Sequence, residues 1–407
     1  MTDGASPTRL GVILPGGGAR AAYEVGVIRA LAELWPAGLR PQPDILAGTS
    51  AGALNAIFLA GRIDDLGRGA RDLAKLWSSL TVDQVYTHHW LQSWGRRWMW
   101  RHKLAEEPAG DSREGRRRRF GAFLDTAPLR RIVDTQVDWP AIGRHIEAGR
   151  LRGVAITATS YTDNRSVTFF QGAPDITGWT RVRRVGRPVR LTTDHIMASI
   201  ALPILFPSVR IDGCDYGDGS LLQLTPLAPA LHLGADRLLI IAVHAPQGQT
   251  APTMPSPSPS PSPSPSPSPS PDAPSWMTIG GFLFNALFIE GIYLDLERLE
   301  RINATLRSLA VPGGHLLRPV ETLVLSPSVD PASLIAHHRD RISRWLRWMA
   351  RETGPSSAGY AFESYLLFDG GYCHDLIELG YADTLARASE VLRFLEPLAG
   401  GERLADT

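Results

Sequence analysis

The first sixty residues contain the same pattern twice: a short apolar run, a tight glycine turn and an apolar stretch with helical spacing. Residues 9–14 lead into the glycines at 16–18, and residues 44–47 lead into the turn at 48–52. Two later runs have the length and composition of buried strands, at 154–158 and 237–243. Strands that alternate with helices form parallel sheets covered on both faces. We therefore expect an α/β fold with a largely parallel central sheet.

Composition permits a sizeable core and excludes one class of partner. The 407 residues are 43% hydrophobic, which is enough for one large domain or two smaller ones. The 42 Lys and Arg residues balance 41 Asp and Glu residues, for a net charge of +1. A chain without a strong overall charge has no general attraction for nucleic acid, so we expect no nucleic-acid partner.

Three features bear on the location of the protein. Its two cysteines, Cys214 and Cys373, offer at most one disulfide, which fits a reducing compartment. The first apolar run breaks at Pro15 and is too short for the apolar core of a signal peptide. The longest apolar stretch, residues 279–294, falls short of the ~20 residues that span a bilayer. We expect a cytoplasmic protein, or one peripheral to the inner face of the membrane.

The turn at residues 48–52 has the form G-x-S-x-G, with Ser50 between Gly48 and Gly52. In a strand–turn–helix context, these glycines permit a sharp nucleophile elbow that exposes the serine at the start of a helix. The helix N-terminus stabilises negative charge that develops nearby. The alternative is an ordinary tight turn. The flanking strand and helix favour Ser50 as a nucleophile.

The glycine turn at Gly16, Gly17 and Gly18 allows backbone N–H groups to approach a ligand closely. An oxyanion hole and a phosphate loop are both consistent with it. The turn lacks the Gly-Lys-Ser/Thr ending of a nucleotide loop, and Ala21 stands where a dinucleotide fingerprint has glycine. An oxyanion hole is therefore the better interpretation. Arg20 would orient this loop or bind a substrate phosphate, and the alternative is that it is a solvated helix residue.

Two residues that follow Ser50 are candidates for its base. Asp218 lies between two glycines, and His244 follows the run at 237–243. The order Ser, Asp, His is compatible with a catalytic triad, and a Ser–Asp pair is also possible. The residues alone leave both alternatives open.

Four motifs in this order resemble the patatin-like phospholipases. They are Gly16-Gly17-Gly18-Ala19-Arg20, Gly48-Thr49-Ser50-Ala51-Gly52, Ala198-Ser199-Ile200-Ala201-Leu202-Pro203 with Phe206-Pro207, and Asp218-Gly219. The resemblance covers residues 9–244, and residues 365–395 are similar to the tail of bacterial members.

The resemblance implies a three-layer α/β/α fold and a lipid acyl hydrolase with a catalytic dyad. Ser50 would attack the acyl carbon, Asp218 would accept its proton, and water would hydrolyse the acyl-enzyme. Backbone N–H groups of the glycine turn and of Ala51 would form the oxyanion hole, and Gly219 would shape the turn after the base. His244 would then be structural, and we interpret His195 and Ser199 as packing residues. The resemblance implies no cofactor and no metal.

Two departures from the family pattern concern local geometry. Ser220 stands where the aspartate motif usually ends in glycine or alanine, and Ala21 replaces a frequent glycine. Neither removes a reacting group. Ser220 puts the fine geometry of the turn in doubt more than the activity.

The domain organisation follows from composition. We predict a catalytic domain at 8–245, a Pro/Ser linker at 251–275 and a mainly helical C-terminal part at 276–400 packed on the catalytic domain. Within the first, residues 86–120 carry four of the eleven tryptophans and the arginine run 116–119. Tryptophan and arginine together suit a lipid interface, so this segment is either a lipid-docking cap or a solvated loop.

Two other functions remain compatible with the sequence. One is a Ser–Asp–His esterase or thioesterase that uses His244. The other is a non-catalytic module that binds lipid or a protein partner. The head group, acyl position, oligomeric state and protein partners do not follow from the sequence.

Overall fold

The computed structural model describes residues 8–36, 42–88, 122–223, 226–245, 276–308, 318–341 and 363–400. Only the backbone is described at 276–291, 339–340 and 399–400. The predicted linker at 251–275 and most of the predicted cap at 86–120 lie outside the described residues.

A ten-stranded mixed sheet forms the centre of the molecule, and its main path has the order β12-β11-β1-β2-β5-β6-β8-β7. The strands on that path are β1 (Leu10–Leu14), β2 (Ile45–Thr49), β5 (Gly153–Ser160), β6 (Arg165–Gly172), β7 (Trp179–Arg181), β8 (Arg184–Pro188), β11 (Arg237–Ile241) and β12 (Glu321–Leu325). The two other strands are β9 (Val209–Ile211) and β10 (Cys214–Asp218), and β10 pairs with β5. The block from β12 to β5 is parallel, as the alternation of strands and helices predicts.

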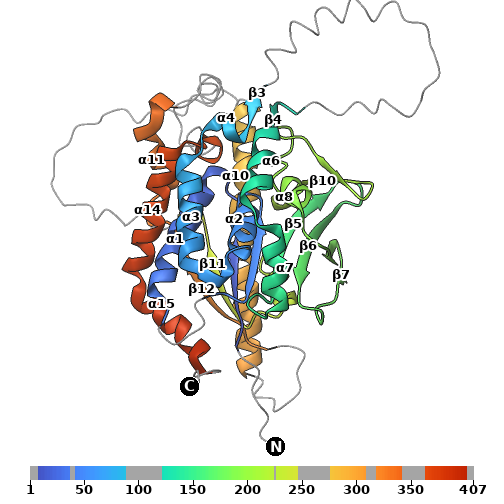
Figure 1. Cartoon of the computed structure of the whole chain (residues 1–407), viewed down its shortest axis with the longest axis vertical. Helices are drawn as coiled ribbons and strands as arrows, with labels where there is room; N and C mark the ends of the chain where they lie inside the picture. The colour runs from blue at the N-terminus through green and yellow to red at the C-terminus, as the bar shows by residue number, and fades with distance from the viewer. Residues whose placement is uncertain are drawn as a thin grey trace, which may run out of the picture.

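Helices cover both faces of the sheet (Figure 1). One face packs against α1 (Ala22–Leu34), α2 (Ala51–Ala60), α3 (Leu66–Ser79), α8 (Thr193–Ser199) and α14 (Gly370–Ala386). The other packs against α9 (Ala228–His232) and α10 (Trp276–Ser308). The three-layer α/β/α fold is confirmed.

Further helices among the described residues are α4 (Val82–Val85), α6 (Ala127–Gln136), α7 (Trp139–Glu147), α11 (Pro331–Leu334) and α15 (Ala388–Leu395). Strand β3 (Thr87–His88) pairs with β4 (Leu124–Asp125) in a separate small sheet.

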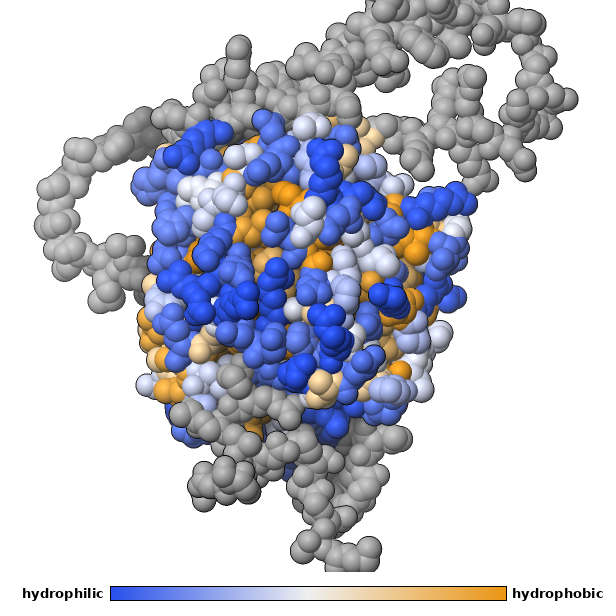
Figure 2. Space-filling view, viewed as in Figure 1, coloured by the Kyte–Doolittle hydropathy of each residue, from blue (hydrophilic) through white to orange (hydrophobic). Residues whose placement is uncertain are grey.

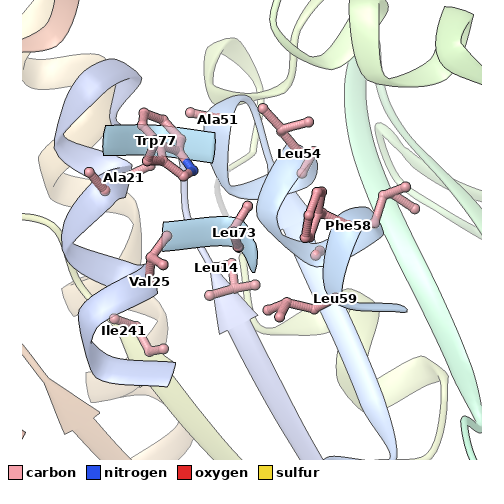
Figure 3. Packing of buried hydrophobic residues seen from close by; sticks show 14 of the residues in the cluster. Leu14, Ala21, Val25, Ala51, Leu54, Phe58, Leu59, Leu73, Trp77 and Ile241 are labelled. Carbon is pink, nitrogen blue, oxygen red and sulfur yellow. The ribbon is translucent and has the colours of Figure 1, made fainter. Parts of the chain in front are cut away.

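The core on the first face is built from strand and helix side chains that point toward each other. Figure 3 shows Leu14 of β1 at the level of Val25 of α1, with Trp77 of α3 above them and Ile241 of β11 below. The outer face of α3 is polar, and Figure 2 shows hydrophilic residues over much of that side. No helix among the described residues is both long and apolar enough to cross a membrane.

Helices α1 and α14 approach closely because each has a glycine at their contact. A Cβ on Gly26 would lie 1.9 Å from the carbonyl oxygen of Ile377, and one on Gly380 would lie 2.2 Å from that of Tyr23. Tyr23 also donates a hydrogen bond to Asp383 at 3.2 Å. Helix α14 is therefore an integral part of the core.

We predict that Gly26→Ala destabilises the fold, although alanine is the better helix former. The added methyl group must push α14 away, and such overpacking costs roughly 1–3 kcal/mol. Gly143→Ala in α7 is the matched control, since its Cβ would meet only the Gln171 side chain at 3.6 Å. That variant should gain up to about 1 kcal/mol. Thermal or urea unfolding measures both changes, and equal stability of the two variants would contradict the prediction.

Candidate active site

Ser50 lies in the turn between β2 and α2 with φ 52° and ψ −127°. A positive φ is strained for a residue with a Cβ, and such strain gathers at functional sites. The flanking glycines make the turn possible. A Cβ on Gly48 would lie 2.4 Å from the carbonyl oxygen of Gly52, and one on Gly52 would lie 2.1 Å from that of Leu14. The turn therefore has the geometry of a nucleophile elbow.

Asp218 ends β10 and lies beside Ser50 because β10 and β2 both pair with β5. Its carboxyl group is fully buried, and burial raises the pKa of Asp218 to about 6. Hydrogen bonds from the Ser50 hydroxyl and from Ser220 lower that pKa and offset part of the effect. The Ser220 N–H donates to Oδ1 at 2.8 Å. Ser220 thus supplies a backbone donor at the position where the sequence departs from the family pattern.

The second carboxylate oxygen, Oδ2 of Asp218, has no hydrogen bond of ordinary geometry within the described chain. The Ser50 hydroxyl nevertheless lies near enough to stabilise the carboxylate and lower its pKa. Gly219 keeps the turn tight, since a Cβ there would lie 2.2 Å from the Thr157 carbonyl oxygen.

Ser199 connects the nucleophile turn to the sheet. Its hydroxyl donates to the carbonyl oxygen of Thr157 at 2.6 Å and accepts the N–H of Ser50 at 2.8 Å. Two residues later, the Ala201 carbonyl accepts the N–H of Asp218 at 2.8 Å. The end of α8 therefore holds the backbones of both candidate reacting residues. Sequence reasoning treated Ser199 as a packing residue and missed this role.

The glycine turn follows β1 and lies next to Ser50. Gly16 and Gly17 are buried, whereas Gly18 has φ +54° and lines the same cavity as Ser50 and Ala51. A Cβ on Gly18 would lie 2.1 Å from the Tyr365 carbonyl oxygen, and one on Gly17 would lie 2.6 Å from the Val243 side chain. The turn thus needs glycine both for its conformation and for its packing.

Arg20 is buried behind this turn, with 3% of its surface exposed. Its Nε donates to the Ser364 hydroxyl at 2.6 Å, and its guanidinium group lies 4.4 Å above the Tyr365 ring. Nη2 of Arg20 lies 3.8 Å from Oδ1 of Asp330. These contacts join the glycine turn to the C-terminal part of the chain. They favour the loop-orienting alternative for Arg20 over phosphate binding.

His244 belongs to the same buried group. Its Nδ1 lies 2.8 Å from Nη1 of Arg20, and its Nε2 lies 3.3 Å from the Tyr365 hydroxyl. Burial and the positive charge of Arg20 hold the pKa of His244 well below its usual range. Both ring nitrogens are engaged by residues other than Ser50 and Asp218, which favours a structural role. His195 packs in the core against Phe169.

An apolar cavity opens at Ser50 on the face of the sheet that carries α2, α3 and α8, and its empty volume of about 550 Å³ includes open solvent. Helices α2, α3, α4, α6 and α8 each contribute to its wall. The segment after the undescribed residues 342–362 closes it with Tyr365, Leu366 and Phe368. Its remaining lining is almost wholly hydrocarbon, from Leu54, Trp77, Leu80, Val85, Leu129, Val133, Ile196, Ile200, Leu202 and Phe206. The Ser50 turn therefore faces an apolar pocket.

A family model described as patatin-like phospholipase matches residues 12–231. The chain belongs to the patatin-like phospholipase family. The match includes the glycine turn, the Ser50 elbow and Asp218, but ends before Arg237 and the C-terminal segment. None of the curated proteins matches this patatin-like chain.

Two solved structures are similar to this chain at low sequence identity. The first is human GIVD cytosolic phospholipase A2 in complex with methyl gamma-linolenyl fluorophosphonate, at 13% identity and a TM-score of 0.43. The match covers 98% of this chain and 60% of that one, so this chain spans less than two thirds of its length. The second is VipD from Legionella pneumophila, at 12% identity and a TM-score of 0.31, with 94% and 67% of the two chains covered.

We predict that Ser199→Ala lowers both stability and turnover. It leaves the Ser50 N–H and the Thr157 carbonyl without their buried partner, which costs about 1–3 kcal/mol. Ser160→Ala is the control, because Ser160 is equally buried on β5 but its hydroxyl contacts Asp163. Unfolding curves measure the effect on stability. Ester-hydrolysis rates, measured under conditions where both variants are folded, measure the effect on turnover. Unchanged turnover in folded Ser199→Ala would show that the serine only packs.

Proposed function

We propose that this protein hydrolyses carboxylic esters of lipids, as a phospholipase A-type acyl hydrolase with a Ser50–Asp218 dyad. The observation that carries the proposal is the buried carboxyl group of Asp218 beside the Ser50 hydroxyl, at the mouth of an apolar cavity. Membership of the patatin-like phospholipase family supports a lipid substrate. The acyl chain would lie in the cavity, with its ester carbonyl at Ser50.

The reaction would proceed in two steps. The Ser50 oxygen attacks the acyl carbon while its proton passes to Oδ2 of Asp218. The tetrahedral oxyanion receives hydrogen bonds from backbone N–H groups of the glycine turn and of Ala51. The intermediate then expels the alcohol, which takes the proton from Asp218. Water, deprotonated by Asp218, then attacks the acyl-enzyme, and Asp218 returns that proton to the Ser50 oxygen as the fatty acid leaves.

The surroundings of the dyad suit these roles. With a pKa of about 6, Asp218 is ionised at neutral pH and is a stronger base than an ordinary carboxylate. The Ser50 N–H is occupied by Ser199. The oxyanion would therefore rely on Ala51 and the glycine turn, which Arg20 anchors from behind.

Substitution of the dyad tests the proposal. We expect Ser50→Ala and Asp218→Asn each to reduce hydrolysis of a soluble p-nitrophenyl ester and of phospholipid vesicles by at least about a thousandfold. His244→Ala should lose at most about tenfold, because it removes contacts to Arg20 and Tyr365 and none to Ser50 or Asp218. Loss of activity in all three variants would favour the Ser–Asp–His esterase. Absence of wild-type turnover on every ester would favour a binding module.

The pH dependence of kcat/KM gives an independent prediction. Asp218 must be ionised to accept a proton, so activity should fall below about pH 6 rather than near pH 4. The folded chain binds this proton more tightly than the unfolded chain. Protonation of Asp218 therefore raises the free energy of unfolding as the pH falls below about 6. Its titration does not cause unfolding in this range. Circular dichroism at pH 5 serves as the control that the protein stays folded. A kcat/KM that does not change down to pH 4.5 would contradict the assignment of Asp218 as the base.

We further propose that residues 86–120 dock the protein on a membrane surface beside the cavity. The described residues next to this segment expose apolar side chains, since Phe123 is 54% and Ile204 is 74% exposed. The Phe123 N–H donates to the Ile204 carbonyl, and the neighbouring Leu202 and Phe206 line the cavity. An apolar rim of this kind suits entry of an acyl chain from a bilayer.

We predict that the combined change of Trp94, Trp98 and Trp100 to alanine weakens binding to anionic phospholipid vesicles by about tenfold or more. Hydrolysis of a soluble ester should remain unchanged, because these residues would act on the interface and not on the reaction. Co-sedimentation with vesicles measures binding. Equal vesicle binding by wild type and variant would rule out docking through these tryptophans.

A further inference from the structure

Trp77 of α3 has the largest side chain in the wall of the apolar cavity that opens at Ser50. Only 1% of its surface is exposed, and Figure 3 shows its indole ring at the level of Ala51, where α2 begins. The ring brings one polar group into this hydrocarbon wall, the Nε1–H, and a buried donor needs an acceptor. The position of that acceptor therefore restricts how the ring can lie.

Asn55 of α2 supplies the acceptor. Its Oδ1 accepts the Nε1–H of Trp77 at 2.8 Å. Its Nδ2 donates to the carbonyl oxygen of Ala21 at 3.0 Å and to Oε2 of Glu24 at 2.8 Å. The amide cannot flip, because its oxygen faces a donor and its nitrogen faces two acceptors. Asn55 therefore joins Trp77 to α1 and to the short helix η1 (Gly18–Ala21), which begins in the glycine turn.

Glu24 of α1 holds Asn55 from the other side. Its side chain is completely buried, and burial raises the pKa of Glu24 well above its usual range, which the hydrogen bond from Asn55 only partly offsets. The neutral, protonated carboxyl group is therefore favoured. Its Oε1 has no hydrogen-bond partner within the described chain. The side-chain hydrogen bond that Glu24 does make there is the one to Asn55.

Phe368 restrains the face of the indole ring. The Trp77 and Phe368 rings stack with their centroids 6.1 Å apart and their planes at 24°. Phe368 also lies edge-on to Tyr86, whose hydroxyl donates to the carbonyl oxygen of Leu366 at 2.9 Å. The edge of the Trp77 ring is thus held by Asn55 and its face by the C-terminal segment. A ring restrained in both ways keeps one orientation in the cavity wall.

We propose that Trp77 determines which acyl chains the cavity accepts, and that Asn55 and Glu24 are positioning residues that hold its ring. This role rests on the proposed hydrolysis of lipid esters and adds a specificity-determining side chain to it. A smaller ring would leave more room for hydrocarbon. A ring without its hydrogen bond would turn out of its present position, because the buried N–H must find another acceptor. Both changes should therefore relax the limit on acyl-chain length.

Hydrolysis of p-nitrophenyl laurate and p-nitrophenyl butyrate tests this role. The readout is the ratio of kcat/KM for the laurate ester to kcat/KM for the butyrate ester. We expect Trp77→Phe and Asn55→Ala each to raise this ratio at least about fivefold. Their effects should not add in the double variant, because both act through the position of one ring. An unchanged ratio in both folded single variants would overturn the proposal.

Asn303→Ala is the matched control for loss of a buried asparagine. Asn303 of α10 is buried on the other face of the sheet, where its amide exchanges hydrogen bonds with the backbone of Val320 at 2.7 and 2.9 Å. This variant should lower the Tm but leave the ester ratio unchanged. A rise in the ratio equal to that of Asn55→Ala would show general loosening and would overturn the positioning role of Asn55.

Substitutions of Glu24 separate positioning from packing. Glu24→Gln keeps an acceptor for Asn55 and resembles the neutral carboxyl group, so it should keep the wild-type ester ratio. Glu24→Leu removes the acceptor and should raise the ratio in the same direction as Asn55→Ala. Equal ratios in folded Glu24→Gln and Glu24→Leu would overturn the positioning role of Glu24.

Calorimetric titration of Ser50→Ala with laurate and octanoate separates this role from hydrolysis, because the variant lacks the proposed nucleophile. Addition of Trp77→Phe should shift the ratio of the two Kd values toward laurate at least about fivefold. Saturable binding of both fatty acids with an unchanged ratio would overturn the role of Trp77 and leave the proposed hydrolysis standing. Absence of fatty-acid binding together with absence of wild-type ester hydrolysis would overturn both.

Discussion

The fully buried carboxyl group of Asp218, held beside the Ser50 hydroxyl, is the interaction around which the rest of the site is arranged. A buried carboxylate is costly, and only a few hydrogen bonds stabilise this one. Strands β2, β5 and β10 bring the two residues together, and the end of α8 fixes both backbones through Ser199 and Ala201. The strained Ser50 conformation persists because packing at Gly48 and Gly52 leaves the turn no alternative.

The site extends beyond the residues that the family model matches. Tyr365, Leu366 and Phe368 close the apolar cavity, while Ser364 and Tyr365 hold Arg20 behind the glycine turn. Helix α14 anchors this segment by its close contact with α1. The C-terminal part therefore shapes both the apolar cavity and the surroundings of the glycine turn.

The fold class and the two strand–turn–helix units were predictable because they depend on local patterns. The turn at residues 48–52 requires glycine on either side of Ser50, and that requirement is visible as a motif. The roles of Ser199 and Arg20 were not predictable in this way. Ser199 contacts a residue 149 positions away, and Arg20 contacts Ser364 across 344 positions, so no local pattern records either contact.

The most direct test of the central claim is mass spectrometry of the intact, folded protein after reaction with a long-chain alkyl fluorophosphonate. A serine activated by a buried carboxylate should react at the phosphorus and retain the phosphonyl group. We expect a single adduct on Ser50 in the wild type and much slower labelling in Asp218→Asn. An adduct on another residue, or equal labelling rates in the two proteins, would contradict it.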